Sequence, residues 1–145
     1  MTVDPEINAV RFRWEKQPTG KEFRHGADQL LKQIRSQAVS GLLVDARTIT
    51  AHQKSSLEWI VREWMPEVAS AGIEYVAVVH ESDIIARMEM ESLQDQVQQS
   101  TSFPHFFATE SPRKAQRWIS EQSQSGRSLF SLTQYLSALK LFSLS

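Results

Sequence analysis

Gly41-Leu42-Leu43-Val44-Asp45 is the stretch of sequence that decides the fold class. An unbroken apolar run of this length after a glycine is typical of a β-strand that is buried on both faces, as in a parallel sheet covered by helices. Upstream, residues 9–14 alternate in polarity and predict a half-buried strand, with Val10, Phe12 and Trp14 on its apolar side. Residues 1–3 are the candidate for a preceding hairpin strand.

Capping boxes mark the starts of two helices. Thr19-Gly20-Lys21-Glu22 predicts the first helix, because the threonine hydroxyl can accept from a backbone N–H while the glutamate reaches back to the cap. This helix should run to about Ser36. Thr50-Ala51-His52-Gln53 is interpreted as a second capping box. Pro66 should kink the second helix, because proline removes one backbone hydrogen bond, and Gly72 stands where a left-handed C-cap is expected.

The second half of the chain continues the alternation of strands and helices. Residues 73–79 are rich in β-branched side chains and predict a strand, and residues 103–107 predict the last strand. Between these two strands, Ser82 is the candidate N-cap of a third helix. After the last strand, Ser111 is the candidate N-cap of a fourth helix, with Pro112 in its first turn. The expected apolar stripe of the third helix contains Ile84, Ile85, Met88, Leu93 and Val97, and that of the fourth contains Ala115, Trp118 and Ile119.

This order of elements predicts an α/β domain over residues 1–122. Strands that alternate with helices pair in parallel through right-handed crossovers, and the helices pack on the sheet. We therefore expect a mixed, mainly parallel sheet of about four to five strands with four helices. Residues 123–145 follow this domain as a polar hinge and a C-terminal amphipathic helix.

The C-terminal segment has an apolar face that must be covered. Its apolar residues recur at three- or four-residue steps, which is the pattern of an amphipathic helix. The face packs on its own domain, or it docks on a second copy or another protein. A membrane surface is disfavoured, because only Arg127 and Lys140 would supply positive charge. The candidate assembly face consists of Leu129, Leu132, Leu136, Leu139 and Phe142.

The composition argues against several classes of function. The chain has 145 residues, a formal net charge of −1 and no cysteine. Nucleic-acid-binding proteins usually carry a basic surplus, so we expect no nucleic-acid partner. Without cysteine the chain has no disulfides, thiolate nucleophiles or cysteine-ligated metals. The sequence shows no signal peptide and no run of about 20 apolar residues, so we expect no transmembrane segment and a cytoplasmic location.

The sequence carries no recognisable catalytic or metal-binding motif. The four histidines are scattered, and a lone pair of Glu22 and His25 three residues apart is weak support for a metal site. Gly-x-Ser-x-Gly, Walker and Gly-x-Gly-x-x-Gly patterns do not occur. Glu89 and Glu91 lie on a predicted helix with Arg87, and we expect them on a solvated face. These observations predict a non-enzymatic protein without a cofactor or a metal.

Three segments of the sequence carry a family resemblance: Val10-Arg11-Phe12-Arg13-Trp14, residues 19–23 and Leu42-Leu43-Val44-Asp45-Ala46-Arg47. Residues 57–66 and 77–79 add to it. Together they are similar to the SpoIIAA-like group of the STAS superfamily, which is named for sulfate transporters and anti-sigma factor antagonists. The resemblance extends to about residue 122. It implies a small mixed sheet with four helices, mostly on one face, and a protein that acts by contact rather than by catalysis.

The start of the second helix departs from the family pattern. In the anti-sigma factor antagonists of this family, a phosphorylatable serine lies there in an Asp-Ser-Ser-Gly segment. Residues 50–56 are Thr-Ala-His-Gln-Lys-Ser-Ser in this chain. Ser55 and Ser56 are nearby hydroxyls that do not match the motif, so a phosphorylation switch is in doubt.

The segment from Asp45 to Trp59 is the candidate surface for a partner or a ligand. Asp45 ends a predicted strand, and ligands of open α/β sheets favour the carboxyl ends of strands. The alternative is that Asp45 caps the following loop and pairs with Arg47. Trp59 lies one residue off the stripe of its helix, and we expect it to be partly exposed. The candidate residues are Asp45, Arg47, Thr50, His52, Ser55, Ser56 and Trp59.

Three functions remain in competition. The leading hypothesis is a regulatory or protein-interaction module, with an unidentified protein partner or a second copy as a homodimer. The alternative is a binding protein for a small apolar, lipid-like molecule, held between the sheet and the second and third helices. For it we expect a cavity of roughly 300 Å³ or more, lined by Trp59 or Met88. The third is an enzyme, which requires two of Asp45, His52 and His80 to converge in a cleft.

Overall fold

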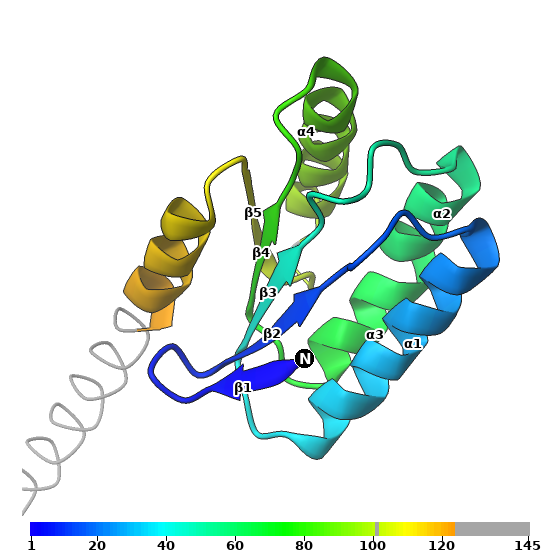
Figure 1. Cartoon of the computed structure of the whole chain (residues 1–145). Helices are drawn as coiled ribbons and strands as arrows, with labels where there is room; N and C mark the ends of the chain where they lie inside the picture. The colour runs from blue at the N-terminus through cyan, green and yellow to red at the C-terminus, as the bar shows by residue number, and fades with distance from the viewer. Residues whose placement is uncertain (101, 124–145) are drawn as a thin grey trace, which may run out of the picture.

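Five strands form one sheet in the order β1-β2-β3-β4-β5, so neighbours along the chain are neighbours in the sheet (Figure 1). The computed structural model describes residues 1–100 and 102–123. β1 pairs with β2 antiparallel, whereas β2 to β5 pair in parallel, which confirms the expected mixed, mainly parallel sheet. The strands are β1 (Thr2–Asp4), β2 (Ala9–Arg13), β3 (Gly41–Asp45), β4 (Tyr75–Val79) and β5 (His105–Thr109).

Three helical connections cover one face of the sheet, and a further helix covers the other (Figure 1). We call these two sides the crossover face and the opposite face. The expected α/β class is confirmed by this arrangement. The connections are α1 (Gly20–Ser36), then α2 (Lys54–Trp59) with the π-helical segment η1 (Ile60–Trp64) and α3 (Met65–Ser70), and finally α4 (Ile84–Gln98). Residues 112–123 form the helix on the opposite face.

The first half of the chain folds largely as its sequence predicts. β1 is the expected hairpin strand, with Val3 opposite Val10. The capping box of α1 is present, because the Thr19 hydroxyl accepts from the backbone N–H of Glu22 at 3.2 Å and the Glu22 carboxylate accepts from that of Thr19 at 3.0 Å. β3 is buried on both faces, with Leu42 in the core of the crossover face and Leu43 in the core of the opposite face.

The predicted capping box at residues 50–53 is wrong. α2 begins at Lys54, and its N-cap residue Gln53 makes no side-chain cap hydrogen bond. The backbone N–H and hydroxyl of Thr50 both bond to the Gln17 side chain, at 2.7 and 3.2 Å. Thr50 therefore joins the loop before α2 to the loop before α1. It lies three residues before the N-cap position, Gln53, and does not cap the helix.

The helix that follows passes through a π-helical turn before Pro66. The backbone N–H of Met65 bonds to the carbonyl of Ile60, five residues back, which is the π-helical spacing. Pro66 then falls in the first turn of α3, where its missing N–H is tolerated. The disruption predicted at Pro66 thus takes the form of a π segment just ahead of it. As expected, Gly72 ends α3 with a positive φ of 101°.

The N-terminal part of α4 differs from its prediction. Its cap is Asp83, whose carboxylate accepts from the backbone N–H of Ala86 at 2.8 Å, and not Ser82. Ile84, Ile85 and Met88 are 70%, 55% and 63% exposed, so they do not belong to the buried stripe. Leu93 and Val97 are buried as predicted, and Ala86 and Met90 complete the buried face, at steps of four, three and four residues.

The last strand begins two residues later than predicted, at His105 instead of residue 103. Pro104 has no backbone N–H and cannot donate to the sheet, whereas the N–H of His105 bonds to the carbonyl of Glu74 at 2.8 Å. In the helix that follows, Ala115 and Ile119 are buried as expected. The hinge after Ser123 and the predicted assembly face at Leu129, Leu132, Leu136, Leu139 and Phe142 lie outside the described residues.

Small residues on the opposite face let the helix of residues 112–123 pack against the sheet. Ala9, Ala77 and Ala115 are fully buried there. A Cβ added to Gly41 would lie 3.0 Å from Cβ of Ala9 and 3.3 Å from Cγ2 of Ile119. The absence of a side chain at residue 41 therefore lets the helix of residues 112–123 approach the sheet. Within residues 1–100 and 102–123, no helix combines the length and apolar character needed to cross a bilayer.

Candidate functional site

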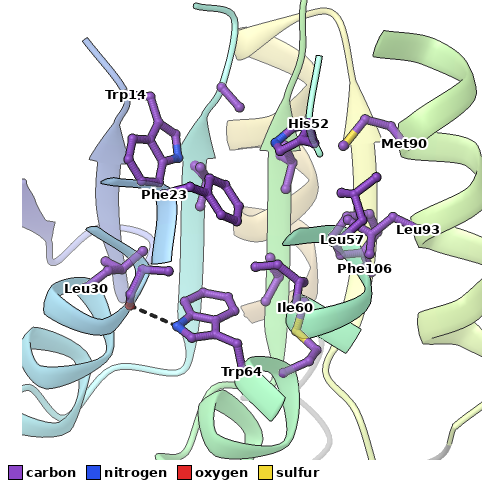
Figure 2. A pocket seen from close by; sticks show the side chains of 16 residues that line it. Trp14, Phe23, Leu30, His52, Leu57, Ile60, Trp64, Met90, Leu93 and Phe106 are labelled. Carbon is purple, nitrogen blue, oxygen red and sulfur yellow. Dashed lines mark hydrogen bonds between the residues drawn. The ribbon is translucent and has the colours of Figure 1, made fainter. Parts of the chain in front are cut away.

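A cavity of about 70 Å³ lies on the crossover face, between the sheet and the helices α1, α2, η1 and α4 (Figure 2). It is in the region expected for an apolar ligand, but it is smaller than expected. Neither Trp59 nor Met88 lines it; Leu57 and Met90 take these places. Its walls are almost wholly apolar and include Trp14, Phe23, Leu30, Ile60, Trp64, Leu93 and Phe106.

Aromatic rings and a hydrogen bond shape the wall on the α1 side. Trp14 stacks on Phe23 with ring centroids 5.3 Å apart. The indole N–H of Trp64 donates to the backbone carbonyl of Ala27 at 2.9 Å, which is the dashed line in Figure 2. This bond satisfies the buried polar atom of Trp64 and ties η1 to α1. Large, anchored rings of this kind cannot collapse into the remaining space.

His52 is the polar side chain at the end of the cavity, between Phe23 and Met90 in Figure 2. Its Nδ1 lies 2.8 Å from Oε2 of Glu89 on α4. The two carboxylate oxygens of Glu89 also accept from the backbone N–H of His52, at 3.0 and 3.1 Å. The side chains are 10% and 16% exposed. Glu89 therefore fixes both the backbone and the ring of His52, and it joins the loop before α2 to α4.

A second, more polar hollow adjoins the cavity at His52. It measures about 120 Å³ and lies between the loop before α1 and the loop before α2. His52 and Phe23 line both spaces. On the polar side the Gln17 amide donates to the carbonyl of Ala51 at 3.0 Å, in addition to accepting from Thr50. The imidazole thus stands between an apolar space and a polar one.

Asp45 and Arg47 form the ion pair that was the alternative interpretation of this segment. The Asp45 carboxylate accepts from the backbone N–H of Arg47 at 3.1 Å and from its guanidinium at 3.0 and 2.6 Å. Hydrogen bonding to Arg47 lowers the pKa of Asp45 below its ordinary value of 3.8, and burial offsets part of that effect. Asp45 is thus satisfied by a residue two positions away.

The seven residues predicted as a partner or ligand surface do not all lie on one exposed face. His52 and Ser56 turn inward, and Ser56 is only 3% exposed. Ser55 is exposed, whereas Trp59 is half-buried beneath the Arg24 guanidinium, 5.5 Å from its ring centroid. The partial exposure expected of Trp59 is confirmed. These residues are spread over different sides because a helix start and its preceding loop point successive side chains in different directions.

The groups expected for an enzyme do not line one common space. His52 lines the apolar cavity, whereas His80 bonds through Nδ1 to the carbonyl of Glu81 at 2.9 Å and lines a separate polar hollow with Arg87 and Lys114. Asp45 lines neither space. In the described part of the chain, no three His, Asp or Glu side chains are placed to hold a metal ion.

Glu89 is the site residue that sequence reasoning missed, since we expected it on a solvated face. A usable signal is the spacing of Met90, Leu93 and Val97, which sets the buried side of α4. Glu89 directly precedes Met90 and lies four residues before Leu93, so it borders this side. The partner, His52, is 37 residues away and has no local signal.

Comparisons with protein-family models, with curated proteins and with solved structures give no match to this chain.

Proposed function

We propose that this chain is a non-enzymatic binding domain of SpoIIAA-like type, and that it binds a small apolar molecule. The observation that carries the proposal is the cavity between the sheet and α2, η1 and α4, with its apolar walls and one fixed polar group. Sites for small molecules are mostly apolar and contain a few placed polar groups that orient the ligand. His52, held by Glu89, is such a group.

The size of the cavity sets the size of the ligand. At about 70 Å³ it is well below the space that drug-sized ligands occupy, roughly 300–1,000 Å³. A long acyl chain therefore does not fit. A single ring, which a protein cavity of about 150 Å³ can hold, fits only if lining side chains move aside. Met65 and Met90 line the space, and methionine side chains adapt their shape to an occupant.

Toluene tests the proposal directly. We expect it to shift the methyl NMR signals of Leu57, Ile60 and Leu93, which line the cavity. The signals of Leu43 and Ile119 in the core of the opposite face serve as the internal control and should stay in place. Absence of any shift at saturating toluene, or equal shifts on both faces of the sheet, would contradict the proposal.

A second candidate is contact with another copy of the chain, and a specific observation favours it. Ile84, Ile85 and Met88 are exposed on the first two turns of α4. Residues three and four apart lie side by side on a helix, so the three side chains make one apolar patch. A two-fold contact between copies places a patch of this kind against itself. This candidate agrees with the predicted role in protein interaction, but the contact surface is on α4 and not at residues 45–59.

Mass in solution, measured by light scattering on the full chain, tests the second candidate. We expect a dimer that becomes a monomer when Ile84→Lys and Met88→Lys are combined. The control is Gln96→Lys, which adds a charge at an exposed position on the same helix. A version stopped after Gln124 reports separately on the tail. A monomeric wild-type chain, or a dimer unaffected by the double change, would exclude this contact.

A further inference from the structure

His52 lines the cavity, and its contact with Glu89 determines which ring nitrogen acts as an acceptor when the ring is neutral. Oε2 of Glu89 lies 2.8 Å from Nδ1 and also accepts from the backbone N–H of His52 at 3.1 Å. An ionised carboxylate only accepts hydrogen bonds, so Nδ1 carries the hydrogen. In the neutral ring Nε2 then bears the lone pair and acts as an acceptor.

The ring is held in one orientation. The His52 side chain is 10% exposed, and the ring of Phe23 packs against it edge to face, with centroids 5.2 Å apart at 81°. Nε2 has no hydrogen-bond partner among the described residues. No fully buried side-chain N or O atom in that part of the chain lacks a partner, so Nε2 is not fully buried, and His52 lines both the cavity and the polar hollow beside it.

The rest of the lining supplies no equivalent acceptor. Trp14 and Trp64 carry N–H donors only, and the Trp64 donor is already bonded to Ala27. The sulfur atoms of Met65 and Met90 accept weakly. A ligand group that donates a hydrogen bond therefore has one strong side-chain partner in the lining, which is Nε2 of His52.

We propose that the cavity selects small apolar molecules that carry a single hydroxyl or N–H group, and that this group donates a hydrogen bond to Nε2 of His52. The inference rests on the proposed function, because it names the chemical class of the ligand for the same cavity. Hydrocarbons leave Nε2 without a hydrogen-bond partner. Ethers cannot bond to it either, because an ether oxygen and Nε2 are both acceptors. Both are therefore disfavoured against alcohols, phenols and small amines or azoles of the same size.

Phenol and toluene are the matched probes, since they differ by a hydroxyl in place of a methyl group. In the full chain with labelled histidine, we expect phenol to move the ¹⁵N signal of Nε2 of His52 and toluene to leave it nearly unchanged. His52→Phe removes the acceptor and keeps a ring. It should weaken phenol binding by about two- to tenfold without weakening toluene binding. His25→Phe, the same change at an exposed site on α1, should alter neither.

The outcomes separate the two levels of the proposal. If toluene and phenol both shift the methyl signals of the cavity but phenol leaves the ¹⁵N signal of Nε2 unchanged, the inference about His52 is wrong and the binding function stands. If neither probe shifts the cavity methyl groups, both are wrong. Should His52→Phe fail to fold, the Nε2 signal of the wild-type chain still decides, since it needs no variant.

Discussion

The two faces of the sheet are both apolar, yet only one of them contains the cavity described above. On the opposite face small residues such as Ala77 and Ala115 are fully buried, and the helix of residues 112–123 lies close to the strands. On the crossover face rings and long side chains meet, and a space of about 70 Å³ remains. The difference lies in the shape and anchoring of the side chains, since both faces are lined by apolar residues.

Hydrogen bonds hold the crossover face open. Trp64 is fixed to the backbone of α1 through Ala27, and His52 is fixed to α4 through Glu89. A side chain that gives up its only partner by moving leaves a buried polar group unpaired, which costs about 1–3 kcal/mol. These bonds therefore oppose collapse into the cavity.

The largest expected effect contrasts the same change on the two faces. Ile119→Ala on the opposite face should lower the free energy of unfolding by about 2–5 kcal/mol, because a fully packed side chain leaves a void. Ile60→Ala should cost at least about 1 kcal/mol less, because Ile60 already borders empty space. Urea unfolding of the two variants makes the comparison. Equal costs would mean that the faces are packed alike.

Enlarging a side chain should give the reverse contrast. Ala115→Leu on the opposite face should cost about 1–3 kcal/mol, because the extra carbons find no room. Ala27→Leu, at a helical position that lines the cavity, should be neutral or stabilise by up to about 1 kcal/mol. Thermal unfolding can report both. A loss at Ala27→Leu as large as that at Ala115→Leu would show that no usable space exists beside α1.

A smaller effect concerns the polar anchor of the cavity. Glu89→Ala should lower the free energy of unfolding by about 1–2 kcal/mol, because the backbone N–H and Nδ1 of His52 lose their acceptor. Glu91→Ala, an exposed glutamate on the same helix, should change stability by less than about 0.5 kcal/mol. Chemical denaturation of both variants gives the difference. No difference between the two would remove Glu89 as an anchor.

The smallest expected effect on stability concerns Asp45 at the end of β3, which lies on the same side of the strand as Leu43 and so toward the opposite face. Arg47→Gln removes the partner of Asp45 and should cost less than about 1 kcal/mol at neutral pH, because the pair is partly exposed. The folded state lowers the pKa of Asp45 below 3.8. The stabilisation from the ionised Asp45 is therefore complete above pH 3.8, and it is lost as the pH falls through the pKa of Asp45 in the folded state. Unfolding curves of both proteins should converge in acid; a gap that persists there would exclude this linkage.

The strands and the first helix were predictable because their signals are local. The alternation before Trp14, the apolar run at residues 41–45 and the capping box at Thr19 each specify an element from a few adjacent residues. The pairing of Asp45 with Arg47 spans two residues and was available as an alternative for the same reason.

The start of α4 was predicted wrongly because two faces of the helix fit the same rule. Ile84 and Met88 are four residues apart, as are Ala86 and Met90, so spacing alone does not choose between them. The pair that continues into Leu93 and Val97 is the buried one. Choosing by apolarity favoured Ile84 over Ala86, although a small residue packs well where the helix is close to its neighbours.

The candidate site was beyond sequence reasoning because its parts are far apart along the chain. His52 and Glu89 are separated by 37 residues, as are Trp64 and Ala27. Their contacts depend on how the crossover helices lie on the sheet, and no motif at any of these four positions reports it. Two long-range hydrogen bonds therefore define a space that local patterns could only place approximately.

Xenon binding tests the central claim most directly. A xenon atom is small enough for the cavity, and apolar cavities in proteins bind it. In a crystal of the full chain under xenon pressure, we predict a xenon peak between the sheet and η1, in contact with Ile60 and Met90, and none beside Ala77 on the opposite face. No peak in the cavity, or a peak only on the opposite face, would contradict the account.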